Sequence, residues 1–180
     1  MAVCGIASGI TASCSDLRRV GGVNKRAWLF NIDGVSYTTD VNGYITAISF
    51  PTYEGLFTFE SQKKSHSGGY TLVNQAGGNK FFQHDAIMKL FATTPADDEV
   101  IEDLTTAQVG LILQTNNGEF ILYGKDNGMD MSAATQNSGT ESASDTTDTL
   151  TFMGEERDKP KRVFITSSAV TLALLESYEV

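Results

Sequence analysis

The sequence contains few of the residues on which most catalytic and metal-binding sites depend. Its 180 residues include only two histidines, two cysteines and three prolines. Zinc sites usually show paired cysteines or an HExxH pattern, and neither is present. The P-loop, the GxGxxG fingerprint and the GxSxG elbow are missing as well. We therefore expect a protein that is not an enzyme and that needs neither a metal nor a cofactor.

Long apolar runs and a cysteine framework are also lacking. No stretch approaches the ~18 apolar residues of a transmembrane helix, so we expect a soluble chain without a membrane anchor. The opening residues, MAVCGIASGITASC, have neither the basic start nor the long apolar stretch of a secretory signal. Cys4 and Cys14 are too few for a disulfide framework and are predicted to be free thiols.

Positive charge is scarce. The chain has 13 Lys and Arg against 22 Asp and Glu, a formal net charge of −9. Binding to nucleic acid or to an anionic membrane needs clustered cations, and the basic groups here are short and interrupted by acidic residues. This excess of acidic residues disfavours binding to nucleic acid and to anionic membranes. It is compatible with a surface that repels DNA.

The few candidates for chemistry have simpler explanations. In a strand, His84 and Asp85 point to opposite faces, as do Glu155 and Glu156, so neither pair is expected to form a joint site. Both histidines are predicted to have structural or solvent-exposed roles. The segment DNGMD lacks the acidic third position, the glycine at the sixth and the glutamate at the twelfth of a calcium loop, and is predicted to be a plain turn.

The sequence is rich in the residues that form strands and tight turns. It has 17 glycines, many β-branched and aromatic residues, and long stretches of alternating apolar character. Asp33-Gly34 and Asn42-Gly43 suit type I′ turns and predict a three-stranded meander over 25–50. Phe57 and Phe59 alternate with polar residues in a half-buried strand, and the apolar run 81–91 predicts another strand.

A hairpin and a helix are the clearest single elements. The stretch VGLILQTNNGEFILY predicts a hairpin at Asn117-Gly118. Its first strand places Val109, Leu111 and Leu113 on one face and Ile112 on the other, and the apolar alternation of its second strand predicts that both faces are covered. The stretch TTPADDEVIEDLTTAQ predicts a short helix over 95–106. There Thr94 is the cap, Pro95 suits the first helical position, and the acidic residues that follow match the helix dipole.

The remaining segments complete a single-domain plan. Residues 1–24 are predicted to be an N-terminal arm of small residues. Residues 132–148 are predicted to be a long flexible loop, because they lack the apolar area to order themselves. The C-terminal stretch SSAVTLALLESYEV is compatible with a helix or a strand. The expected fold of 25–180 is mainly β, an antiparallel sandwich or barrel with one short flanking α-helix.

The order of these elements resembles the major tail tube family among the virion structural proteins of tailed bacteriophages. The segments that carry the resemblance are VGGVNKRAWLFN, LFTFESQK and KFFQHDAIMKLF, followed most specifically by YGKDNGMD and TLTFMGEE. It covers roughly residues 18–165 and includes no catalytic motif. The tract 132–148 need not match any loop of the family.

The resemblance implies a structural subunit that self-assembles into hexameric rings, which stack into the hollow tube of the virion tail. Its partners would be copies of itself, other tail proteins and double-stranded DNA that passes through without specific binding. Two alternatives stay open. One is another virion ring protein, such as a head–tail connector or a tail terminator. The other is a carbohydrate- or ligand-binding β domain with Trp28, Tyr37 and Tyr44 as aromatic candidates, although core packing explains these residues better.

A channel for DNA implies an acidic wall, since each Lys or Arg on it would add a phosphate contact that slows the DNA. Four carboxylates in or beside predicted strands are the candidates for this wall: Asp40, Glu60, Asp85 and Glu119. Alternation along a strand allows only one face of a sheet to meet the channel.

Deletion of residues 2–20 is expected to leave a folded monomer and to abolish tubes. The arm has too little apolar area to order by itself, so its contacts should come from neighbouring subunits. Circular dichroism would follow folding and negative-stain microscopy would follow assembly. Tubes of normal length from the truncated protein would refute the idea.

Overall fold

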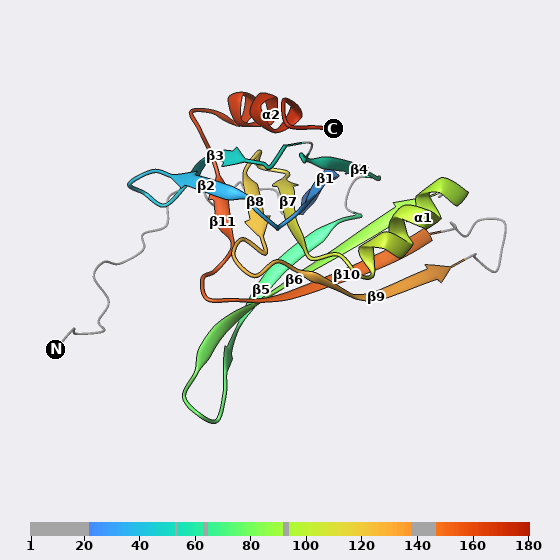
Figure 1. Ribbon diagram of the computed structural model, residues 1–180, viewed down its shortest axis with the longest axis horizontal. Coiled ribbons are helices and arrows are strands. Elements are labelled where there is room, and N and C mark those ends of the chain that lie inside the picture. Colours follow the sequence, from blue (N-terminus) through green and yellow to red (C-terminus); the bar gives the residue numbers. More distant parts are fainter. Residues whose placement is uncertain (1–21, 53, 63–64, 92–93, 138–146) are drawn as a thin grey trace.

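The structure is a computed structural model and describes residues 22–52, 54–62, 65–91, 94–137 and 147–180. Within them the chain forms two β-sheets and two short helices (Figure 1). The predicted mainly β fold is confirmed. The predicted N-terminal arm, Cys4 and Cys14 lie outside the described residues, except that β1 already begins at Val23.

The larger sheet has seven strands in the order β2-β3-β11-β8-β7-β1-β4. It is mixed rather than purely antiparallel, because β11 pairs parallel to β3 through Val163 and Ile45. Its two end strands, β2 and β4, do not pair with each other in the described part of the chain, so the sheet is open and no barrel closes. The strands are β1 (Val23–Asn31), β2 (Ser36–Thr39), β3 (Ile45–Ser49), β4 (Phe57–Glu60), β7 (Val109–Thr115), β8 (Phe120–Tyr123) and β11 (Lys161–Val163).

The smaller sheet has four antiparallel strands in the order β5-β6-β10-β9. Its centre is the long ladder between β6 and β10, which runs from Phe91 paired with Thr147 to Phe82 paired with Glu156. The predicted strand in the apolar run 81–91 is therefore confirmed. The strands are β5 (Ser67–Asn74), β6 (Lys80–Phe91), β9 (Asp130–Asn137) and β10 (Thr147–Glu156).

Two hydrophobic cores lie on opposite faces of the seven-stranded sheet. The first fills the space between the two sheets and includes Leu29, Leu111, Met88 and Phe152. The second lies between the seven-stranded sheet and the C-terminal helix α2 (Ser168–Glu176), where Leu175 meets the aromatic residues of the sheet. The molecule is thus layered as α2, seven-stranded sheet and four-stranded sheet (Figure 1).

The hairpin of β7 and β8 confirms the predicted alternation. Leu111 and Leu113 face the core between the sheets, and Ile112 faces the core under α2. In β1, Leu29 faces the first core and Trp28 the second. Because both faces are buried, these central strands are almost continuously apolar, as is usual for strands covered on both sides.

The helix α1 (Pro95–Leu104) begins where the sequence predicted and ends two residues earlier than 106. Its cap is a reciprocal capping box: the Asp97 N–H donates to the Thr94 hydroxyl, and the Thr94 N–H donates to the Asp97 carboxylate. The second helix, α2, resolves the ambiguity of the C-terminal stretch. Its cap is Ser167, whose hydroxyl accepts from the Val170 N–H.

Two expectations from the sequence are wrong. The meander over 25–50 does not form, because β1 pairs with β4 and β7 and never with β2. The tract 132–148 is not a loop throughout. Its residues 132–137 belong to β9 and 147–148 to β10, and 138–146 lie outside the described residues. Backbone pairing with β10 orders β9 even though its side chains contribute little burial.

Three hairpins close through the same three-residue loop instead of a type I′ turn. In the β2–β3 hairpin, the Asp40 N–H donates to the Tyr44 carbonyl over 3.0 Å and the Gly43 N–H donates back to the Asp40 carbonyl over 3.1 Å. The loops before Asn79 and Glu119 repeat both bonds. The last loop residue is always a glycine with positive φ, which matches a type I turn followed by a left-handed residue.

Gly110→Ala is expected to lower the free energy of unfolding by about 1–3 kcal/mol, as overpacked cores do. Gly110 pairs with Phe30 across the β1–β7 ladder, and an added Cβ would overlap the buried Phe30 ring. Urea unfolding provides the measurement. Gly77→Ala is the matched control, because a Cβ there meets no atom within 4 Å. Equal stability of the two variants would contradict the close packing of β1 on β7.

Candidate functional site

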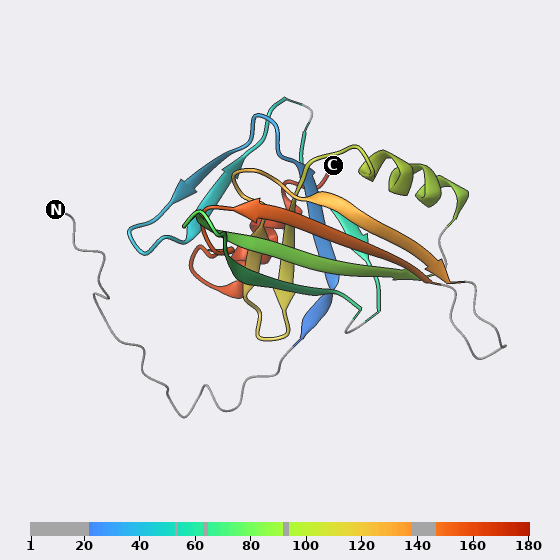
Figure 2. The same ribbon diagram turned by 90° about the horizontal axis from the view of Figure 1, so that it is seen from below.

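The outer face of the four-stranded sheet is not covered by another element in the described part of the chain. Seen from that side, β5, β6, β10 and β9 lie in front with no helix over them (Figure 2). Inward residues such as Met88 and Phe152 are fully buried, whereas Ile87 and Met153 on the outer face are 39% and 38% exposed. The sheet therefore presents one face to the core and one to its surroundings.

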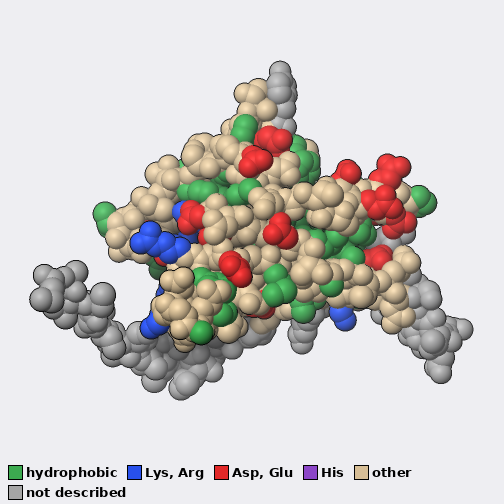
Figure 3. Space-filling model, turned by 60° about the horizontal axis from the view of Figure 1, so that its bottom comes forward, with side chains coloured by type: hydrophobic (Ala, Val, Ile, Leu, Met, Phe, Trp, Pro, Cys, Tyr) green, Lys and Arg blue, Asp and Glu red, His purple; other side chains and the backbone are tan. Residues whose placement is uncertain are grey.

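The charged groups of this face are mainly carboxylates. Cross-strand pairing places Met153 between Asp85 and Asp130, and Glu155 lies next along β10, opposite Gln83. Among the described strand residues that point to this face, the basic one is Lys89, which lies further along β6. Acidic side chains are scattered over the middle of this side of the molecule (Figure 3).

Sequence reasoning identified Asp85 on this face and missed Asp130 and Glu155. Alternation in TLTFMGEE was a usable signal for Glu155, since the buried Phe152 fixes which residues of β10 point outward. The expectation that Glu155 and Glu156 point apart is confirmed, because Glu155 is exposed and Glu156 is buried. No signal marked Asp130, because β9 was not recognised as a strand.

Both edges of the four-stranded sheet are unpaired in the described part of the chain. The strand β5 pairs with β6 alone, and β9 pairs with β10 alone. Soluble proteins usually protect such edges with lysine, proline or a covering element. Neither β5 (SGGYTLVN) nor β9 (DMSAATQN) contains a lysine or a proline.

The other three predicted wall residues lie away from this face. Asp40 is in the β2–β3 turn, where its carboxylate accepts the N–H groups of Asn42 and Tyr44 over 2.9 and 2.8 Å. Glu119 is in the β7–β8 turn, 3.8 Å from Arg162. The four carboxylates are therefore not brought together, and Asp40 has a structural role in its turn.

Glu60 belongs to an ion-pair network at the β4 edge of the seven-stranded sheet. Its carboxylate lies 2.9 Å from the Arg26 guanidinium, which also reaches Glu176 of α2 over 3.0 Å. The Trp28 indole N–H donates to Glu179 over 2.8 Å, and this bond helps lower the pKa of Glu179. The network ties β1 and β4 to the C-terminal segment, so Glu60 is placed for stability.

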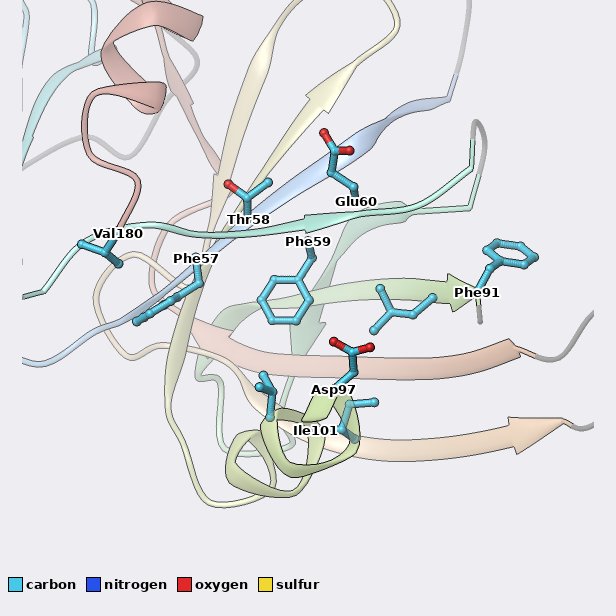
Figure 4. A pocket seen from close by; sticks show the side chains of 10 residues that line it. Phe57, Thr58, Phe59, Glu60, Phe91, Asp97, Ile101 and Val180 are labelled. Carbon is cyan, nitrogen blue, oxygen red and sulfur yellow. The ribbon is translucent and has the colours of Figure 1, made fainter. Parts of the chain in front are cut away.

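A groove of about 370 Å³ with a mixed polar and apolar lining lies between β4 and α1 (Figure 4). Phe57 and Phe59 point from β4 toward the helix, whereas Thr58 and Glu60 point to the opposite side of the strand. This alternation is the one that the sequence predicted. The polar side chains of the groove are Thr58 and the carboxylates of Glu60 and Asp97. Asp97 is held in the capping box, where its carboxylate accepts from Thr94.

The two histidines are buried and have structural roles. The Gly124 N–H donates to His84 Nδ1 over 3.2 Å, so Nε2 carries the proton and donates to the Asp158 carbonyl over 2.9 Å. Burial lowers the pKa of His84, against the opposing effects of the Asp158 carbonyl, Glu156 and Asp85. Burial likewise lowers the pKa of His66, whose Nε2 lies 3.0 Å from the Lys25 carbonyl.

The segment 126–130 forms a turn that a buried carboxylate holds in place. Glu156 is 2% exposed, and its Oε1 accepts the N–H groups of both Asp126 and Asn127 over 2.9 Å. Among the described residues, no group of three or more His, Cys, Asp or Glu side chains is arranged to hold a metal ion. In the same part of the chain, neither helix has the length and apolar character needed to span a membrane.

The aromatic candidates for ligand binding do not form one surface. Trp28 is fully buried under α2, with its ring centroid 5.9 Å from that of Phe120. The Tyr37 hydroxyl is buried, and its ring lies 5.3 Å from the Lys125 ammonium group. Tyr44 lines two surface grooves near the β2–β3 turn. Core packing accounts for Trp28, as the sequence favoured.

Comparison of the chain with protein-family models, with curated proteins and with solved structures gave no match in any of the three. Arguments about function therefore rest on the residues of this chain and on their arrangement.

The free energy of unfolding is expected to fall by on the order of 1 kcal/mol between pH 7.5 and 5.5. Burial holds the pKa of His66 and His84 below the ordinary 6.5, so the unfolded chain binds protons in this window that the folded chain does not. The stability that comes from keeping the two histidines neutral is fully present above pH 6.5. It is lost as the pH falls from 6.5 toward the pKa values of the two histidines in the folded protein. Urea unfolding at both pH values measures the change. A flat profile, or an unchanged slope after both histidines are replaced by glutamine, would contradict the assignment.

Proposed function

We propose that the chain is a structural subunit of a bacteriophage tail tube, which self-assembles into stacked hexameric rings around a channel for DNA. The observation that carries the proposal is that both edges of the four-stranded sheet are unpaired among the described residues and contain neither lysine nor proline. In a monomer such edges favour aggregation, whereas in a ring each edge finds a defined strand on the next subunit. The resemblance in the order of elements points the same way.

The uncovered face between these two edges supports the proposal that the rings surround a channel for DNA. If subunits join through β5 and β9, their four-stranded sheets form one continuous wall, and this face lines one of its sides. The face carries Asp85, Asp130 and Glu155 against Lys89. A wall of this kind offers DNA few phosphate contacts. The proposed wall therefore keeps Asp85 from the sequence and adds Asp130 and Glu155. The other three candidates from the sequence lie elsewhere.

Negative-stain microscopy of the concentrated protein tests the proposal, with rings or tubes as the expected result. Thr71→Lys combined with Thr135→Lys places a charge on each free edge, where lysine blocks strand pairing. Both threonines are exposed, so we expect this variant to fold and to lose assembly.

The matched control is Thr52→Lys combined with Thr106→Lys, which adds the same charge at exposed positions outside the strands. It should assemble like the unmodified chain. Monodisperse monomers of the unmodified chain at high concentration would refute the proposal and favour a ligand-binding β domain. Assembly by the edge variant would show that the subunits join elsewhere.

A further inference from the structure

A basic groove lies between the two sheets, on the side of the β2–β3 turn. Its volume is about 390 Å³, and its walls include Tyr44, Tyr70 and the three cations Lys159, Lys161 and Arg162. Four of the chain's 13 Lys and Arg residues fall within 157–162, so this is the densest basic segment of an acidic chain.

The groove is exposed, and two of its cations form ion pairs at the surface. Tyr70 is 52% exposed, and Lys159 is also exposed. Lys161 lies 2.8 Å from Asp158, and Arg162 lies 3.8 Å from Glu119. Ion pairs at an exposed surface contribute little and can be exchanged for others. The groove therefore suits an acidic partner with some apolar surface.

The helix α1 carries charge of the opposite sign, because it is acidic where the groove is basic. Its ten residues include five carboxylates and no basic residue. The residues that line the grooves against the sheets are Asp97, Val100, Ile101, Asp103 and Leu104. The remaining acidic side chains of the solvent face are exposed: Asp98, Glu99 and Glu102. Val100, at the border of this face, is 46% exposed and supplies an apolar contact.

The two surfaces lie at opposite ends of the molecule. In both ribbon views α1 lies toward one end of the longest axis and the β2–β3 turn toward the other (Figures 1 and 2). Basic side chains gather toward the groove end and acidic ones toward the α1 end (Figure 3). The helix of one chain therefore does not reach its own groove. Complementary patches at two different places on one molecule join copies head to tail, which generates rings or filaments.

We propose that the basic groove receives the solvent face of α1 from a second copy of the chain. Asp98 and Glu102, one helical turn apart, face Lys159 and Arg162, while the exposed edge of α1 near Val100 contacts the tyrosines of the groove. The contact rests on the self-assembly proposed above and goes beyond it by naming which surfaces meet and which charges set the direction. Because exposed charges carry it, the contact weakens as salt shortens the range of electrostatic interactions.

A charge-swap experiment tests the contact. The groove variant is Lys159→Glu with Arg162→Glu, and the helix variant is Asp98→Lys with Glu102→Lys. Sedimentation velocity at low salt measures association, and circular dichroism melts measure folding. Each variant alone should associate at least about tenfold more weakly than the unmodified chain, since like charges then face each other. An equimolar mixture should regain association, because each helix then meets a groove of opposite charge.

The matched control is Lys80→Glu with Lys89→Glu, which makes the same change in net charge at exposed positions of β6. It should associate like the unmodified chain. Weakening equal to that of the groove variant would assign the effect to net charge and overturn the contact. If a reversal variant fails to fold, Lys159→Gln with Arg162→Gln replaces it, and the same loss of association is expected.

The outcomes separate this contact from the proposed function. Tubes formed by the unmodified chain and equally by both reversal variants would overturn the contact and leave the tail-tube function standing. Salt-sensitive dimers or short chains that obey the charge swap, without rings or tubes, would support the contact and refute the tube. A chain that stays monomeric at every ionic strength would refute both.

Discussion

The structure depends on the burial of both faces of the central strands β1, β7 and β8. Trp28, Phe30, Ile112 and Phe120 form the core under α2, and the residues that alternate with them form the core between the sheets. Burying a large apolar side chain contributes roughly 1.5–3 kcal/mol, so a strand that does this on both sides anchors every layer packed against it. The close approach of Phe30 to Gly110 shows how little space these layers leave.

The arrangement of the outer elements follows from this centre. The C-terminal helix covers one face, and its segment is fastened by the Trp28–Glu179 bond and by the backbone bond from the Leu56 N–H to the Tyr178 carbonyl. The four-stranded sheet covers the other face and uses its own apolar side to do so. Its second side then has no partner among the residues that the structure describes. The exposed face and the two free edges are consequences of a sandwich with a helix on only one side.

Charge is distributed over this scaffold in a way that net charge does not describe. The value of −9 combines an acidic helix at one end, a basic groove at the other and a sheet face with three carboxylates and a lysine. Several other carboxylates stabilise the fold, whether or not they lie on these surfaces. Glu156 holds a turn, Glu60 joins two elements, and Asp40 and Asp97 satisfy backbone N–H groups. A strand or turn position alone therefore does not indicate whether a carboxylate meets a partner.

The sequence by itself determined the local elements, because their causes are local. The capping box of Thr94 and Asp97 defines where α1 begins, the Asn-Gly pairs close two hairpins, and alternation in β6, β7 and β10 assigns their buried sides. Only the tertiary structure decided which strands pair. The Asp33-Gly34 turn suggested that β1 and β2 are neighbours, but the apolar faces of β1 are better covered between β4 and β7. Likewise β9 has a single large apolar side chain, Met131, and becomes a strand because β10 pairs with it through a ladder of backbone bonds. The exposed sheet face, its carboxylates and the groove between Tyr44 and Tyr70 arise from such long-range pairing, which no short window of sequence contains.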